Sequence, residues 1–352
     1  MRKFSKVMIV TMAIALTLAF MPAGAFADTT SAASGTVSAK VTVDASSSWG
    51  FDMVDQTVTA TSDMAEKYYP ATAKAETAGK VTVADVLVAA HIAKYGAAFK
   101  NDPTAYLDMS ASQYGTSMVK QFGHSIVGSY AVNNELSKTA VSASTVKDGD
   151  VVKIGSYTDK SYTDLFSYFD KDSYSAKAGS SLPVKVTAAI YDYTAGKQVS
   201  IVPETCTINT VDENSGDVTA LTYKTDAAGT AIVSFAAPGT YYITALGLVK
   251  GPYGTGGIMA PLAKVNVGLN APAAKISKKK AASAKISWGK VTGASKYKVY
   301  RATKKSGKYK CVKTTTARSF INKKLKKGKH YYYKVKAVSG SYTSSYSNIV
   351  RK

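Results

Sequence analysis

The stretch from Leu325 to Val338 reads LKKGKHYYYKVKAV and joins a turn signal to a strand signal. Gly328 interrupts a run of lysines, and from Tyr331 onward the residues alternate in character. Successive side chains on a strand point to opposite faces of a sheet. The alternation therefore predicts a strand with one buried face and one outer face that carries tyrosine and lysine.

The rest of the C-terminal region repeats this pattern in short runs separated by turn residues. We expect strands at 284–288, 297–301, 309–314, 331–338 and 347–350. The runs ISW at 286–288, ASKYKVYR at 294–301 and SSYSNIV at 344–350, together with the opening stretch, resemble a fibronectin type III domain. The resemblance covers 269–352 and is greatest to the lysine-rich versions found in modular exported surface proteins of Gram-positive bacteria. It implies a β-sandwich.

The resemblance also implies that the strands at 297–301 and 331–338 are neighbours, and the alternation along each strand separates core residues from outer ones. The expected core set is Trp288, Tyr297, Val299, Leu325, Tyr331, Tyr333 and Val335, with Leu325 and a tyrosine of the triplet forming a corner. The expected outer set is a candidate polyanion-binding face: Lys298, Tyr300, Tyr332, Lys334 and Lys336. Lysines on strands also discourage edge pairing, so a plain solubilising surface is the alternative.

The charge of the chain is concentrated in this region. The whole sequence has 45 Lys+Arg and 23 Asp+Glu, a formal net charge of +22. Residues 271–352 hold 24 basic residues and no acid, because Asp226 is the last acid in the chain. Such a field attracts polyanions whatever else it does.

Lysine dominates the basic residues, which bears on the kind of polyanion. Only Arg301, Arg318 and Arg351 are arginines in 271–352. Readers of specific bases depend on the arginine fork, so we expect no specific nucleic acid as a partner. We expect instead an anionic cell-envelope polymer, similar to a teichoic acid, or a host or cell-surface ligand.

The N-terminus predicts export. Residues 1–27 have a basic start, an apolar run and an A-x-A motif, which together are typical of a cleaved signal peptide. The alternative, a membrane anchor, is disfavoured because the apolar run is short. We expect a polar leader at 28–36, no transmembrane segment or covalent anchor in the mature chain, and an extracellular or cell-surface location.

Two further domains are expected between the leader and residue 269. Residues 37–170 combine strand patterns with a helix at 82–95 that Thr82 would cap, and predict an α+β domain. This region resembles the C-terminal α+β domain of the cobalamin carriers transcobalamin and intrinsic factor, which would imply a small-molecule ligand such as a corrinoid. Residues 171–268 have short strands at regular spacing and resemble bacterial immunoglobulin-like β-sandwiches.

Two short motifs approach known chemistry without reaching it. Gly123–Gly128 reads GHSIVG, in which Val127 stands where the serine elbow G-x-S-x-G needs its second glycine. Asp212–Asp217 is rich in oxygen ligands but lacks the glycine and the bidentate acid of an EF-hand, so a hairpin turn is expected.

No spacing of the three histidines and two cysteines predicts a metal site, and Cys206 and Cys311 are expected to be free, buried thiols. We therefore expect a non-enzymatic, mainly β, multi-domain binding protein, with no catalytic residue, metal or cofactor. Its basic domain would hold it at the cell envelope. The alternatives are an extracellular small-molecule-binding protein that uses the α+β domain and, less favoured, a hydrolase.

Overall fold

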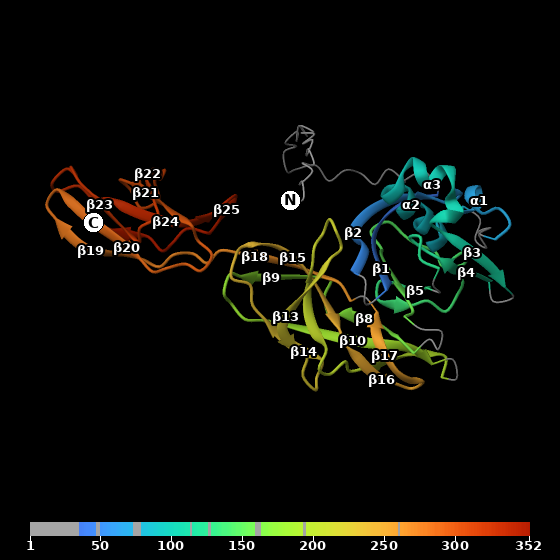
Figure 1. The fold of residues 1–352 in the computed structure, drawn as a ribbon. Coiled ribbons are helices and arrows are strands. Elements are labelled where there is room, and N and C mark those ends of the chain that lie inside the picture. The colour runs from blue at the N-terminus through green and yellow to red at the C-terminus, as the bar shows by residue number, and fades with distance from the viewer. Residues whose placement is uncertain are drawn as a thin grey trace, which may run out of the picture.

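A computed structural model describes residues 35–46, 50–72, 79–112, 115–125, 128–158, 163–192, 195–259 and 261–352. The expected signal peptide and most of the leader lie outside these residues. The chain is mainly β and forms an N-terminal α+β module followed by two β-sandwiches (Figure 1). Within the described residues, no helix has both the length and the apolar character needed to cross a membrane.

The first module is a mixed sheet covered on one face by helices. Its elements are β1 (Thr36–Ser46), β2 (Gly50–Thr61), α1 (Met64–Tyr68), α2 (Val83–Tyr95), α3 (Ala97–Asn101), a 3-10 turn (Pro103–Ala105), β3 (Asp108–Ser112), β4 (Gly115–Lys120), β5 (Gly128–Val132), β6 (Glu135–Leu136) and β7 (Val151–Ser156). The sheet order is β2-β1-β7-β5-β6, with β1 and β7 parallel at its centre. This is a β-grasp order. Its core is filled by 26 buried apolar residues from the sheet and the helices.

Local sequence explains the start of α2 and the turn after β5. The Thr82 side chain accepts a hydrogen bond from the Asp85 backbone and the Asp85 carboxylate accepts one from the Thr82 backbone, which is the expected capping box. Asn133 and Asn134 both have positive φ, 52° and 67°, as a two-residue hairpin turn requires.

His91 is a core residue of this module. Phe122 donates its backbone N–H to His91 Nε2 at 2.9 Å, and Nδ1 therefore carries the proton that is shared with Leu87 O at 2.7 Å. Burial lowers the pKa of His91 to about 4. Protonation would place two N–H groups face to face, so the ring is built to stay neutral.

The second module is a sandwich of two sheets, in the orders β11-β10-β8-β17-β16 and β13-β12-β15-β18-β9, with β14 on β10. Its strands are β8 (Leu165–Phe169), β9 (Ser173–Lys177), β10 (Leu182–Asp192), β11 (Lys197–Ile201), β12 (Thr207–Val211), β13 (Val218–Lys224), β14 (Thr230–Val233), β15 (Gly239–Leu246), β16 (Leu248–Gly251), β17 (Gly254–Met259) and β18 (Ala263–Gly268). The boundary expected at residue 170 falls after β8, but β8 pairs with β10 and β17. The sandwich therefore includes 165–169, which sequence reasoning gave to the first module.

The third module is a smaller sandwich of β19-β20-β23 against β22-β21-β24-β25, with β26 on β24. Its strands are β19 (Ala274–Lys280), β20 (Ser283–Trp288), β21 (Lys296–Ala302), β22 (Lys310–Thr315), β23 (Ser319–Asn322), β24 (Tyr332–Ser339), β25 (Tyr342–Thr343) and β26 (Val350–Arg351). The strand expected at 347–350 is largely absent. Ser344 and Ser347 use side-chain oxygens to accept the β24 N–H groups of Ala337 and Val335, both at 2.9 Å, which replaces a regular ladder.

The first two modules are docked through a turn that the sequence marks as acidic. Asp212 Oδ1 accepts from the backbone of Asn214 and Ser215, both at 2.9 Å, so the turn supplies its own donors for the carboxylate. Gly216 O then accepts the Phe51 backbone N–H at 3.0 Å. A small apolar cluster is buried around this contact: Phe51, Val54, Val211, Tyr242 and Leu262. The expected hairpin turn is confirmed, and it serves as a docking surface.

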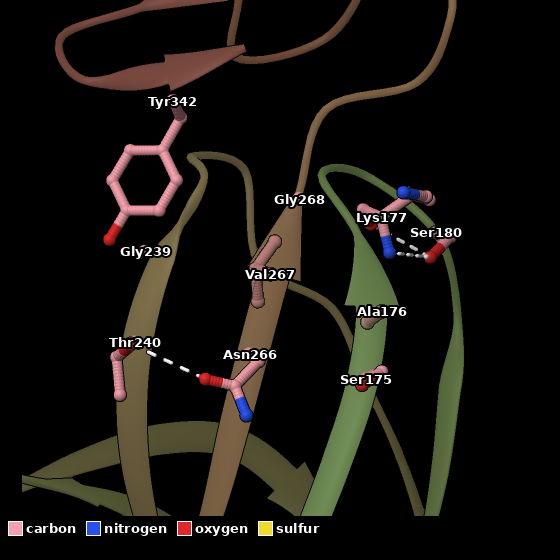
Figure 2. A pocket seen from close by; sticks show the side chains of 10 residues that line it. All are labelled: Ser175, Ala176, Lys177, Ser180, Gly239, Thr240, Asn266, Val267, Gly268 and Tyr342. Atoms are coloured by element: carbon pink, nitrogen blue, oxygen red, sulfur yellow. Dashed lines mark hydrogen bonds between the residues drawn. The ribbon is translucent and has the colours of Figure 1, made fainter. Parts of the chain in front are cut away.

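The second and third modules meet through loops. A Cβ on Gly179 would lie 2.9 Å from Thr292 Cγ2, and one on Gly293 would lie 2.8 Å from Pro238 Cδ. Beside this contact is an open cavity of about 550 Å³. Figure 2 shows Tyr342 of the third module over the strand ends at Gly239 and Gly268, with Thr240 bonded to Asn266.

Replacing Gly216 by Ala should undock the first module. A Cβ there would lie 1.7 Å from Phe51 O, and the backbone φ is +77°. Gly196→Ala is the matched control, because Gly196 has a similar φ of +63° but no atom within 4 Å of the added Cβ. We expect limited proteolysis to separate the first two modules in the Gly216 variant only. Equal cleavage of both variants would contradict the docking role.

The stability of the first module should fall between pH 6.5 and pH 4. In that pH range His91 binds a proton in the unfolded chain but not in the folded one. The contribution of neutral His91 to the free energy of unfolding is therefore fully present above the unfolded pKa of 6.5 and is lost as the pH falls towards about 4. The shift corresponds to about 3 kcal/mol. Urea unfolding at a series of pH values would measure it. The His91→Phe variant should lose most of this dependence, while exposed His124→Gln should retain it.

Candidate polyanion-binding face

Strands β20, β21 and β24 supply most of the core of the third module through their inward-facing residues. All seven residues of the expected core set have exposed fractions of 8% or less and lie in one cluster: Trp288, Tyr297, Val299, Leu325, Tyr331, Tyr333 and Val335. The Tyr331 hydroxyl accepts the Lys326 N–H at 3.2 Å, which forms the corner beside Leu325. A tyrosine bonded back to an upstream backbone is typical of such sandwiches.

The five residues of the candidate face lie on the opposite side of the same strands. Lys298, Tyr300, Tyr332, Lys334 and Lys336 are all half-buried rather than core. The register of β21 on β24 places Lys298 opposite Lys336 and Tyr300 opposite Lys334. Tyr332 lies at the end of the ladder, opposite Ala302.

Aromatic rings hold two of these lysines in place. Lys334 Nζ lies 4.3 Å from the ring centroid of Tyr309 and 5.1 Å from that of Tyr346. Lys336 Nζ lies 4.3 Å from the centroid of Tyr346, which also meets Tyr300 edge-on at 5.2 Å. A cation over a tyrosine ring gains about 0.5–1 kcal/mol at an exposed site. The rings thus hold the ammonium groups on the face without removing their charge.

Sequence reasoning missed Tyr309 and Tyr346. Tyr309 precedes β22 and was expected only as a strand residue. Tyr346 lies between Ser344 and Ser347, whose hydroxyls bond β24 and replace the regular alternation. The spacing of the two serines around Tyr346 is the one signal that could have pointed to it.

No carboxylate side chain opposes the charge of the face. Residues 269–352 are all described, and none of their lysines or arginines forms an ion pair with a described carboxylate. Lys298 and Lys336 stand directly across the ladder, and like charges there are destabilising. Burial, with Tyr346 and Cys311 nearby, raises the pKa of Tyr300. The face therefore combines two tyrosines with three lysines that no described carboxylate opposes.

The serine-elbow motif does not form an elbow. His124 closes a tight turn with Gln121, with N–H to O distances of 2.8 and 3.0 Å, and the next element is strand β5 rather than a helix. Ser125 is exposed, and Ile126 and Val127 lie outside the described residues. An elbow needs a strand followed by a helix, so this turn lacks the required geometry.

No described cluster of three or more His, Cys, Asp or Glu could hold a metal ion. Both cysteines are free thiols. Cys206 is buried as expected, but Cys311 is exposed. The expectation of a buried Cys311 is wrong because β22 is an edge strand with one neighbour, β21.

No family model and no curated protein matches the chain. Solved structures that match include an Fn3-like protein from Clostridium thermocellum, 27% identical over 24% of this chain and 86% of that one, with a TM-score of 0.21. A two-domain fibronectin type III segment of chicken tenascin is 17% identical over 50% of this chain and 94% of that one, at a TM-score of 0.36. A human fibronectin type III domain is 22% identical over 24% and 84%, at 0.23. The fold of the third module rests here on its own strand order and core.

The tyrosine triplet offers a test of these assignments. Tyr331→Phe should lower the free energy of unfolding of the third module by about 0.5–1.5 kcal/mol, because the Lys326 N–H loses its acceptor. Tyr333→Phe should leave it unchanged or raise it by about 1 kcal/mol, because the Tyr333 hydroxyl is buried without a hydrogen-bond partner.

Urea unfolding, followed by Trp288 fluorescence in a Trp49→Phe background, would measure both changes, since the chain has 2 tryptophans. Equal losses for the two substitutions would contradict the assigned roles.

Proposed function

We propose that this chain is an exported, non-enzymatic binding protein whose third module holds it on an anionic cell-envelope polymer similar to a teichoic acid. The observation that carries the proposal is the set of 24 basic residues in 271–352, none of which is paired with a carboxylate of the described residues. Unpaired charges remain available to a polymer of opposite sign. Export is supported only by the sequence of residues 1–27.

The face of the third module supports binding to phosphate groups rather than to bases. Its cations are lysines, which act as point charges, while base readout depends on arginine forks. Its two ring-held lysines come from alternate positions of one strand, β24, and are presented together. Binding to nucleic acid in vitro should therefore be independent of sequence and sensitive to salt.

The first two modules would then be the presented part of the protein. They dock through the Gly216 turn and through a second cluster of Ala131, Phe166 and Met259. These contacts support one rigid unit rather than two domains joined by a flexible linker. The resemblances to immunoglobulin-like and transcobalamin-type domains fit a scaffold or binding role for this unit.

A small-molecule role has one observation in its favour. A cavity of about 370 Å³ lies where the first two modules meet, lined by aromatic and apolar side chains that include Tyr157, Phe166, Tyr191, Tyr253 and Met259. That volume is near the lower end of the range for small-ligand sites. The core of the first module is filled by buried apolar side chains, but an open cavity of about 570 Å³ also lies on this module, beside Met118, Tyr130 and Val141. No feature of the junction specifies a corrinoid.

Truncation tests the proposed function. The chain from Asp28 should bind Gram-positive cell walls and purified poly(glycerol phosphate), and a version that ends at Gly268 should not. Retention should fall as salt rises to about 1 M, where the screening length is about 3 Å. Circular dichroism would verify that the shorter chain is folded. Equal retention of both chains, or retention indifferent to salt, would contradict the proposal.

A further inference from the structure

The basic residues of the third module are gathered at one end of the sandwich. This end is formed by the β19–β20 turn, the β21–β22 loop, the β23–β24 loop and the residues at the close of β26. It carries thirteen of the 24 basic residues: Lys278, Lys279, Lys280, Lys304, Lys305, Lys308, Lys323, Lys324, Lys326, Lys327, Lys329, Arg351 and Lys352. We call this group the lysine pole.

Hydrogen bonds and strand pairing join the segments of the pole. Leu325 N–H donates to Ala282 O at 2.9 Å, so the β23–β24 loop lies against the β19–β20 turn. Lys352 Nζ donates to Ala281 O at 2.8 Å, and Lys352 N–H donates to Tyr331 O at 2.9 Å. Arg301 opposite Lys310 places the start of β22 at this same end. All the pole residues except half-buried Lys352 are exposed.

The other end of the module is poor in charge and faces the second module. It holds four basic residues, Lys275, Lys290, Lys296 and Arg318. Thr292, Gly293 and Tyr342 at this end meet the second module. In Figure 1, β25 lies nearest the second module and the C-terminus lies on the far side.

The rest of the mature chain has the opposite sign. Residues 28–270 contain 18 Lys+Arg and 23 Asp+Glu, a formal charge of −5. Strand β24 has 8 residues, so the sandwich is about 26 Å long at about 3.3 Å per residue. That is about three screening lengths at physiological salt. The pole therefore acts as an independent charge, far from the acidic modules.

We propose that the lysine pole is the main contact with the anionic polymer and that the protein stands on it end-on, with the first two modules directed away. This inference rests on the proposed function and names the part of the third module that performs it. An anionic surface attracts the pole and repels the net-negative modules, so both forces favour the same orientation. The candidate face then adds side contacts.

The polymer is of the phosphodiester type found in envelopes, rather than a nucleic acid. Only one of the thirteen pole residues, Arg351, is an arginine. Of the rings at this end, Tyr309 and Tyr331 already have cations over them, at 4.3 and 5.3 Å, which leaves half-buried Tyr332 and exposed His330. Binding of single strands depends on free aromatic rings on which bases stack. The pole therefore offers thirteen cations and few free rings, which favours a polymer bound through its phosphates.

Two variants that lose the same charge at opposite ends provide the test. The pole variant combines Lys279→Gln, Lys305→Gln, Lys326→Gln and Lys329→Gln. The control combines Lys275→Gln, Lys290→Gln, Lys296→Gln and Arg318→Gln. All eight side chains are exposed, so neither set should unfold the module. A third variant removes the charges of the face through Lys298→Gln, Lys334→Gln and Lys336→Gln.

Affinity for poly(glycerol phosphate) and for a single-stranded oligothymidylate would be measured in the full mature chain at several salt concentrations. The pole variant should bind at least about tenfold more weakly, and its salt slope on the oligonucleotide should fall by about 0.7 for each contacting lysine. The control should change by less than about threefold. Pole lysines, but not those of the control set, should be protected from acetylation in the complex.

Each outcome separates this inference from the proposed function. A wild-type chain that does not bind, or binds indifferently to salt, overturns the proposed function and the pole with it. Normal wild-type binding with equal losses in the pole and control variants overturns the pole alone, as does a larger loss in the face variant. Tighter binding to oligothymidylate than to poly(glycerol phosphate), at equal phosphate, overturns the choice of polymer.

Discussion

Mutual repulsion among like charges is the force that the third module must overcome in order to fold. Its 24 basic residues have no acid among them, and Lys298 faces Lys336 directly across two strands. The opposing force is burial of an apolar core from both sheets, including Ile286, Val299 and Tyr333, which are fully buried. Apolar burial contributes about 25 cal/mol per Å² and does not depend on charge. The fold therefore tolerates a surface whose charges are all positive, because burial of the apolar core stabilises it.

The distribution of that charge limits its cost. Placing the pole on loops and strand ends separates its ammonium groups from those on the face, and exposed charges interact only weakly beyond the screening length. On the face, the rings of Tyr309 and Tyr346 lie beside Lys334 and Lys336, and each ring presents its negative side to a lysine. The rings fix the cations while leaving the charge free to attract a ligand.

Short-range parts of the structure were predictable from sequence, and long-range parts were not. Capping of α2 by Thr82, the Asn133–Asn134 turn and the two faces of β24 depend on neighbours within a few residues. The pairing of β8 with β17 joins segments nearly a hundred residues apart, and the sequence of Leu165–Phe169 fits either module.

The candidate site divides in the same way. Alternation along β21 and β24 predicted the five residues proposed for the face, because that rule needs only one strand at a time. The position of the Tyr346 ring over Lys336 depends on Ser344 and Ser347, whose side chains replace a regular ladder. The lysine pole could be predicted only by knowing that four separate segments of the chain meet at one end of the sandwich. The count of acids showed that the module is basic. Only the topology showed that its basic residues are concentrated at one end.

Because the charge of the third module is of one sign, added salt should change its stability and its affinity for a polyanion in opposite directions. Screening relieves the repulsion within the third module and so stabilises it, while the same screening weakens its attraction to a polymer. A bound polyanion has the first effect without the second, since it supplies the absent negative charge at the pole. Under the proposed function, the unliganded module would be the less stable state and the polymer-bound module the more stable one. This coupling follows from having cations alone, and a module that balanced its lysines with acids would lose both properties together.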